Sequence, residues 1–330
     1  MQFFNKQIFF IASIFSSITI TASPFNDEIN TVIHELIKVN HTTKVLANVS
    51  KNTLFIEASG EPYNLSALSK YKGELSLTLR FTNTKTSISK ETECLITPSV
   101  KNLNISSDTP LNLSFITSFI NLEELVIFSD EIHNIEAISQ CKKLKKLKIE
   151  IKSLESLNFL KDINLSQISI KRCINLTDIS GLAGMSLIDV ELVYLPKLHD
   201  ISALKGSPLK KLIIMLTPID NISNLNCSFL NYLNLFGTSV SNIEVLKDAP
   251  LYRLNLCNTK VIDLSPLIGK KIVSLDVKLP PPKHLKEFEN TIAQIEIGEL
   301  GLGIENFDRL SNHNWDSFAK VKNSISFIKQ

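Results

Sequence analysis

The sequence has little of what catalytic and metal-binding proteins usually carry. Its six histidines are scattered, and they form neither an H-E-x-x-H motif nor a close spacing with cysteine. No nucleophile elbow, phosphate-binding loop or dinucleotide-binding glycine pattern occurs. Because no acid, base and nucleophile converge in the pattern, we expect a protein that is not an enzyme and that uses no cofactor and no metal.

Glycine and proline are also few, at 10 and 12 residues in a chain of 330. Hydrophobic residues make up 44% of the chain, a globular composition that excludes a disordered one. The formal net charge of +2 argues against a nucleic-acid-binding protein, because such proteins carry a much stronger basic excess. We therefore expect no nucleic acid among the partners.

Long hydrophobic runs are missing as well. The apolar run over residues 8–20 is shorter than the ~20 residues that span a bilayer. It follows Lys6 and precedes small residues at Ala22 and Ser23, which is typical of a secretory signal peptide over residues 1–23. We favour cleavage there over a retained membrane anchor. The mature protein is then expected, without a stable membrane span, to be secreted, periplasmic or at the cell-envelope surface.

What the sequence has in abundance is a repeated aliphatic pattern. Residues 251–267 carry aliphatic residues at positions 1, 4, 6, 11, 14 and 17 of a unit that then starts again. Position 4 is filled by Leu54, Leu77, Leu103, Leu125, Leu147, Ile168, Val190, Leu212, Leu233, Leu254, Leu275 and Ile295. Position 6 is filled by Ile56, Leu79, Ile105, Ile127, Ile149, Ile170, Leu192, Ile214, Leu235, Leu256, Val277 and Ile297. This is the leucine-rich-repeat pattern.

The spacing within each unit predicts its local structure. Positions 4 and 6 have the period of two of a strand with one buried face, and positions 11, 14 and 17 have the period of three of a tight turn or 3₁₀ return. Asp200 and Asp263 recur just before the position-14 aliphatic residue of their units. We interpret them as acids that stabilise the turn rather than as catalytic groups.

The ends of the repeat array need covers, because a terminal repeat exposes a hydrophobic face. Residues 24–50 are expected to form an N-terminal helical cap, with Ile29, Val32 and Leu36 on one face. Residues 51–297 hold about twelve repeats, with an irregular insertion at 80–99. Residues 298–330 are assigned to a C-terminal cap with a helix over 311–328, in which Trp315 covers the last repeat.

Units such as Asn121–Leu125 and Val261–Leu267 resemble the short repeats of internalin-type bacterial leucine-rich-repeat proteins. The resemblance covers roughly residues 50–300. It implies an α/β solenoid, a curved right-handed superhelix with parallel β-strands on the concave face, short 3₁₀ or extended returns on the convex face, and helical caps. The sequence departs from the family at position 9, where the family has asparagine. Asp130, Cys173, Thr217, Thr238 and Thr259 stand there instead.

Cys141 and Cys227 both lie three residues before a position 1 but four repeats apart, whereas Cys173 is at position 9 and Cys257 at position 7 of their units. With repeats ~4.8 Å apart, no pair of them comes within the ~7 Å Cα separation that a disulfide allows. We expect Cys94, Cys141, Cys173, Cys227 and Cys257 to be unbridged, mostly buried thiols.

The candidate site is the row of residues that point outward on the concave strands. The apolar and amide/arginine residues proposed to contact a partner are Val193, Tyr194, Ile213, Met215, Leu216, Tyr232, Phe236, Asn234, Arg253, Asn255 and Asn258. A basic rim flanks them, formed by Lys146, Lys148, Lys171 and Arg172. An apolar patch with a polar rim is typical of an interaction site.

Other interpretations of this patch stay open. It is also consistent with ordinary surface, with position 8 tucked into the turn so that Tyr194 and Leu216 are buried, or with cover by the 80–99 insertion or a second copy. The sequence predicts a non-enzymatic module that binds a protein or peptide on its concave face. The alternative is a structural, envelope-associated protein that packs against itself or surface glycans.

Overall fold

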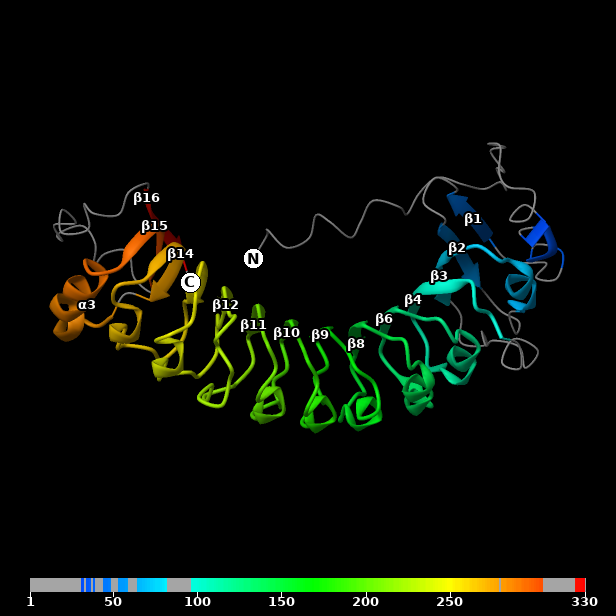
Figure 1. The fold of residues 1–330 in the computed structure, drawn as a ribbon, viewed down its shortest axis with the longest axis horizontal. Helices are drawn as coiled ribbons and strands as arrows, with labels where there is room; N and C mark the ends of the chain where they lie inside the picture. The colour runs from blue at the N-terminus through cyan, green and yellow to red at the C-terminus, as the bar shows by residue number, and fades with distance from the viewer. Residues whose placement is uncertain are drawn as a thin grey trace.

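The computed structural model describes residues 31, 32, 34–36, 38, 44–48, 53–58, 64–81, 96–278, 280–304 and 324–329. These residues form an open, curved solenoid, in which strands line the inner face of the arc and short helices lie along its outer face (Figure 1). The expected signal segment, most of the insertion and Trp315 lie outside the described residues.

One fourteen-stranded sheet runs the length of the arc, in the order β1-β2-β3-β4-β6-β8-β9-β10-β11-β12-β13-β14-β15-β16. Its strands are β1 (Lys44–Asn48), β2 (Thr53–Ala58), β3 (Leu75–Phe81), β4 (Val100–Ser107), β6 (Glu124–Ser129), β8 (Lys146–Ile151), β9 (Gln167–Lys171), β10 (Asp189–Val193), β11 (Lys211–Met215), β12 (Tyr232–Asn234), β13 (Arg253–Leu256), β14 (Lys271–Lys278), β15 (Glu296–Ile304) and β16 (Ser324–Lys329). Two short return strands, β5 (Leu111–Asn112) and β7 (Ile132–His133), pair with each other.

The parallel register confirms the repeat pattern. Leu212 pairs with Leu233, and Leu233 pairs with Leu254, which is the alignment that the position-4 residues predict. These three side chains are 0–1% exposed, so each repeat stacks its aliphatic residues on those of its neighbours. Burial of such a side chain stabilises the fold by about 1.5–3 kcal/mol, and the stack continues from repeat to repeat.

Most returns on the outer face are short 3₁₀ helices, as the period of three predicts, whereas the return between β11 and β12 forms turns instead. These 3₁₀ helices are η2 (Ser66–Lys70), η3 (Ser114–Ser118), η4 (Ile135–Gln140), η5 (Asn158–Leu160), η6 (Ser180–Leu182), η7 (Ser202–Leu204), η8 (Glu244–Leu246) and η9 (Ser265–Leu267). Two residues before most of them an Asn or Asp side chain accepts a backbone hydrogen bond. Asp200 Oδ1 accepts from Ser202 N at 2.8 Å, and Asp263 Oδ1 accepts from Ser265 N at 2.8 Å. The turn-stabilising interpretation of both acids is confirmed.

The N-terminal end is closed by a helical segment and a hairpin. Residues 31, 32, 34–36 and 38 are helical, and Val32 and Leu36 are 2% and 0% exposed, as the predicted cap requires. Glu35 also pairs with Lys70 of η2 at 2.7 Å. The sequence did not predict β1, which pairs antiparallel with β2 and ends the parallel array.

The C-terminal end corrects two expectations. Position 4 of the repeat after β14 is Leu300, which pairs with Leu275, whereas Ile297 pairs with Ile272 and Ile295 precedes the strand. The shift arises because η10 (Pro282–His284) and α3 (Leu285–Ile292) occupy this return and the strands on both sides are longer. Phe288 and Ile292 of α3 are buried, so the helix covers this part of the core.

The helix expected over 311–328 is also wrong in its last part. Residues 324–329 form β16, which continues the parallel sheet with Leu300 opposite Ile325 and Leu302 opposite Phe327. The parallel register therefore runs past residue 297, where the repeats were expected to end.

Candidate partner-binding face

Six of the predicted residues come together at the C-terminal ends of three neighbouring strands. Val193 of β10 pairs with Met215 of β11, and Ile213 pairs with Asn234 of β12. Tyr194 and Leu216 follow directly after β10 and β11, and Phe236 is the second residue after β12. We call the set Val193, Tyr194, Ile213, Met215, Leu216 and Phe236 the apolar ridge. Tyr194 is 49% and Leu216 45% exposed, and the other four are half-buried.

The backbone conformation at Tyr194 and Leu216 directs the two most exposed side chains of the ridge toward solvent. Tyr194 and Leu216 have φ angles of 56° and 52°, in the left-handed region that large side chains rarely adopt. Each is held by its amide, since Tyr194 N donates to Met215 O and Leu216 N donates to Phe236 O, both at 2.9 Å. The interpretation that position 8 is tucked into the turn is therefore wrong for both residues.

The same backbone conformation recurs at position 8 of five successive repeats. Arg172, Tyr194, Leu216, Gly237 and Asn258 all have positive φ. The left-handed residue ends the strand and lets position 9 turn into the core. A row of outward side chains therefore follows the strand ends of β9 to β13, and only Gly237 leaves a gap in it.

Position 9 anchors this turn from inside. Thr217 is 1% exposed, and its hydroxyl donates to Met215 O at 3.1 Å and accepts from Leu195 N at 3.3 Å. Cys173 Sγ similarly accepts from Ile151 N at 3.3 Å. At position 9, Thr and Cys thus take the place of asparagine, and each forms its hydrogen bonds through one side-chain atom, Oγ1 or Sγ, instead of through an amide group. Asp130 does not join them, since it is exposed and pairs with Lys152 at 2.7 Å.

Tyr232 lies apart from the ridge. It stands at position 3, at the opposite ends of the strands, and Asn234 separates it from Phe236 along β12. The Lys211 ammonium lies 6.0 Å from the Tyr232 ring centre, and the Arg253 guanidinium lies 5.9 Å from the ring centre of Tyr252. Tyr232 was expected in the apolar patch, but it lies beside Lys211 and pairs with Arg253 on the next strand.

The amide residues continue from the ridge along position 5. Asn234 Oδ1 accepts from Phe236 N and Asn255 Oδ1 accepts from Cys257 N, both at 2.9 Å. These bonds fix the amide planes. Asn255 Nδ2 then donates to Asp276 Oδ2 on the next strand at 3.2 Å. Asn258 is the left-handed residue of its own repeat and is exposed.

The basic rim is largely neutralised by acids on adjacent strands. Lys148 pairs with Glu124 at 3.4 Å, Lys171 with Glu191 at 2.9 Å and Arg172 with Glu150 at 3.1 Å. Within the described ranges, Lys146 is the rim residue that forms no ion pair. Exposed pairs of this kind contribute little to stability, but they leave this side of the ridge without a strong positive field.

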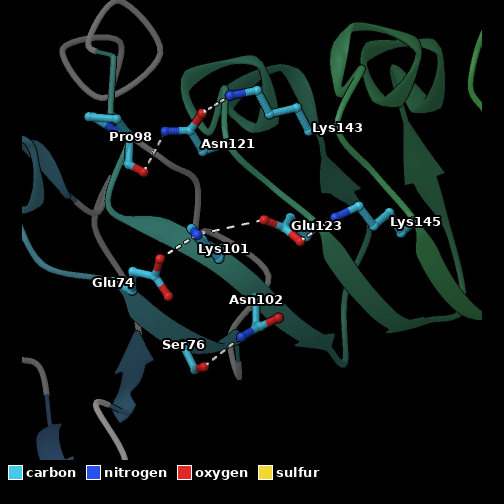
Figure 2. A network of polar contacts seen from close by, with 9 residues as sticks. All are labelled: Glu74, Ser76, Pro98, Lys101, Asn102, Asn121, Glu123, Lys143 and Lys145. Carbon is cyan, nitrogen blue, oxygen red and sulfur yellow. Dashed lines mark hydrogen bonds and ion pairs between the residues drawn. The ribbon is translucent and has the colours of Figure 1, made fainter.

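A second charged row lies beside the strand starts. Glu74, Lys101, Glu123 and Lys145 alternate in sign across consecutive repeats and are linked by ion pairs (Figure 2). Lys145 pairs with Glu123 at 2.8 Å, and the hydrogen bond to Lys145 lowers the pKa of the Glu123 carboxyl. The hydrogen bond to Glu74 raises the pKa of Lys101. These ion pairs therefore link neighbouring repeats, and each of the four charges has a partner of opposite sign within the row.

A cleft of about 300 Å³ opens on the outer side, where the pairing of return strands is interrupted. β5 and β7 pair with each other, and the next bridge along the returns joins Ser156 to Asp178. Ile132, Ile135, Leu154 and Phe159 line the cleft, with carboxylates at its edge. Its polar lining is formed by Glu136, Glu155, Ser153, Ser156 and Asn158.

Two groups on the inner face were not predicted from the sequence. Phe128 is 47% exposed at position 7 of β6, where the repeat pattern could have identified it. Asp276 on β14 and Glu299 on β15 also lie on the concave face of the sheet. Burial, and secondarily the charge of Glu299, raise the pKa of the Asp276 carboxyl. The sequence could not reveal this pair, because it depends on the corrected register of β15.

Four cysteines follow the expectation. Cys141, Cys173, Cys227 and Cys257 are buried and form no disulfide, while Cys94 lies outside the described residues. Burial raises the pKa of Cys141 to about 12 and the pKa values of Cys173 and Cys227 to about 11. They behave as core residues rather than as reactive thiols.

The described residues contain no group of three or more His, Cys, Asp or Glu side chains arranged to hold a metal ion. None of the helices among them has both the length and the hydropathy needed to cross a membrane.

Comparison with known proteins gives matches of structure alone. No protein-family model matches the chain, and no curated protein sequence matches it. The fold is similar to that of an internalin from Listeria monocytogenes, with 18% identity, a TM-score of 0.47, and coverage of 94% of this chain and 93% of that one. It is also similar to a leucine-rich-repeat protein of Leptospira interrogans, with 19% identity, a TM-score of 0.45, and coverage of 80% and 73%. The strand register of the chain itself shows that it is a leucine-rich-repeat solenoid with short repeats, as the sequence pattern predicts.

Proposed function

We propose that this protein is an exported, non-enzymatic binding module that holds a protein or peptide on its concave face. The observation that carries the proposal is the apolar ridge, in which six apolar side chains crowd the ends of three adjacent strands and two are about half exposed. A solenoid without a partner gains nothing from such exposure, and each exposed apolar side chain adds a risk of aggregation.

The geometry of the ridge supports this proposal. Tyr194 and Leu216 are held outward by left-handed backbone, which costs roughly 1–2 kcal/mol per residue for a side chain with a Cβ atom. Conformational cost of this kind tends to collect at functional sites. Tyrosine and methionine are also enriched in protein interfaces.

The experiment begins with a library of random dodecamer peptides displayed on phage. Binders are selected on the immobilised full chain and counter-selected on a Met215→Asp variant. The matched control is Ile262→Asp, which makes the same kind of change at a 49% exposed residue on the convex return. Peptides that bind the wild type and the control equally, and Met215→Asp at least tenfold more weakly, support the proposal.

Two outcomes contradict it. If the selected peptides bind all three proteins alike, the concave ridge is not the site. If light scattering shows a dimer that dissociates on dilution and is lost in Met215→Asp, the ridge instead packs against a second copy. That second outcome favours the structural, envelope-associated alternative.

A further inference from the structure

The side chains at position 5 become more polar from one strand to the next, from the apolar ridge toward the C-terminal end of the sheet. Ile213, Asn234, Asn255 and Asp276 occupy this position on β11, β12, β13 and β14, and the strand register places each beside the next. An apolar side chain is thus followed by two amides and then by a carboxylate.

The acids at the end of this row differ from the other acids of the concave face. Glu124, Glu150, Asp189 and Glu191 each pair with a lysine or arginine on a neighbouring strand. Asp276 and Glu299 form no ion pair within the part of the chain that the structure describes. These two carboxylates therefore stand at the end of the row as acids that no ion pair in the described residues neutralises.

The Asp276 carboxylate can accept a further hydrogen bond from a cation. On one side Asn255 Nδ2 donates to its Oδ2 at 3.2 Å, which leaves the second oxygen for another donor. On the other side Asp276 pairs with Gly301 of β15, a residue that brings no side chain. The raised pKa of Asp276 agrees with this picture, since burial and the charge of Glu299 both disfavour its ionised form and a cation would relieve that cost.

We infer that the partner of the concave face presents an extended peptide that crosses the strands, with an apolar residue on the ridge and a lysine or arginine at Asp276. This inference rests on the proposed function. Three strand spacings of ~4.8 Å separate β11 from β14, and an extended peptide advances ~3.4 Å per residue. The cation is therefore about four residues from the apolar residue, with Asn234 and Asn255 under the intervening backbone.

The test uses the selected dodecamers and synthetic copies of the tightest one. The expected result is a lysine or arginine three to five residues from an apolar residue in most binders. Replacing that basic residue with norleucine should weaken binding to the wild type at least fivefold. It should have little effect on binding to Asp276→Asn, because that variant has already lost the carboxylate. Asp220→Asn is the control, since it makes the same change at an exposed acid on a convex return.

The outcomes separate this inference from the proposed function. If the peptides need Met215 but carry no basic residue and ignore Asp276→Asn, the inference is overturned and the proposed function stands. If Asp220→Asn weakens binding as much as Asp276→Asn, the effect is one of net charge and the inference is also overturned. If no peptide depends on Met215, both fail. Unfolding of Asp276→Asn is measured in parallel, and at neutral pH this variant should be at least as stable as wild type.

Discussion

The side chain of Leu216 lies over Gly237 of the next repeat. A Cβ atom at position 237 would stand 2.8 Å from Leu216 Cδ2, and Gly237 itself has a φ of +70°. Gly237 therefore has two roles. It adopts the left-handed conformation that ends its strand, and it leaves the space in which one of the two most exposed side chains of the ridge rests.

The variant Gly237→Ala tests both roles. Left-handed φ should cost an alanine about 1–2 kcal/mol of unfolding free energy. Gly206→Ala is the matched control, since Gly206 has a φ of +81° and nothing within 4 Å of the added Cβ atom. Because Leu216 Cδ2 is the end of a flexible side chain, we expect similar stability losses in urea unfolding. Only Gly237→Ala should weaken peptide binding, and equal weakening by Gly206→Ala would contradict the positioning role.

The variant Leu254→Ala tests the inward register. Leu254 is 1% exposed between Leu233 and Leu275, and truncation of such a residue costs about 2–5 kcal/mol. Several neighbouring repeats should lose stability together, because each repeat contacts only its neighbours. Lys260→Ala, at an exposed position in the same repeat, should stay within about 0.5 kcal/mol of wild type. A similar loss for both variants in thermal unfolding would mean that the register is wrong.

The hydroxyl of Thr217 is expected to matter more than that of Thr238. Thr217→Val removes the acceptor for Leu195 N, and a buried N–H left without a partner costs about 1–3 kcal/mol. Thr238 Oγ1 only donates to Leu235 O, which also accepts from Thr238 N, so Thr238→Val should cost less. Urea unfolding of both variants measures the difference. Equal losses would show that position 9 does not cap the preceding turn.

Alkaline pH should weaken the fold through its buried thiols. The pKa of Cys141 is raised to about 12 and those of Cys173 and Cys227 to about 11, from an ordinary value of 9.0. The folded state thus keeps its protons where the unfolded state loses them. The contribution is complete below pH 9 and is lost as the pH rises toward 11–12. In urea unfolding between pH 8 and 10.5, Cys141→Ala should show a shallower decline than wild type. An unchanged slope would contradict the burial of this thiol.

Much of the fold could be predicted from the sequence, because the repeat pattern is carried by local spacing. The residues from Leu54 to Leu275 pair in the predicted register. The prediction failed where tertiary context decides. Ile295 and Ile297 have the right spacing, but α3 lengthens the return and moves the position to Leu300. Ile325 and Phe327 are two residues apart, which is the spacing of a strand with one buried face, but this segment was assigned to a helix instead.

The candidate site was predictable in part, for a related reason. Alternation along a strand identifies which residues point outward, and this places Met215 and Phe236 on the concave face. It does not identify the backbone conformation at the strand end, since Tyr194 and Leu216 are not residues that favour positive φ. Nor does it show which charges meet. Lys171 seemed to be part of a basic rim until the register placed Glu191 beside it.

The most direct test of the central proposal is the affinity of one selected peptide for Phe236→Ala. Phe236 follows β12 at one end of the ridge, and truncation of a buried aromatic anchor in an interface costs roughly 2 kcal/mol or more. We predict a loss of about that size in isothermal titration, with thermal unfolding within about 0.5 kcal/mol of wild type because the side chain points away from the core. Lys148→Ala, on the rim, should change mainly the salt dependence. Unchanged affinity of Phe236→Ala, with unchanged stability, would contradict the concave ridge as the binding site.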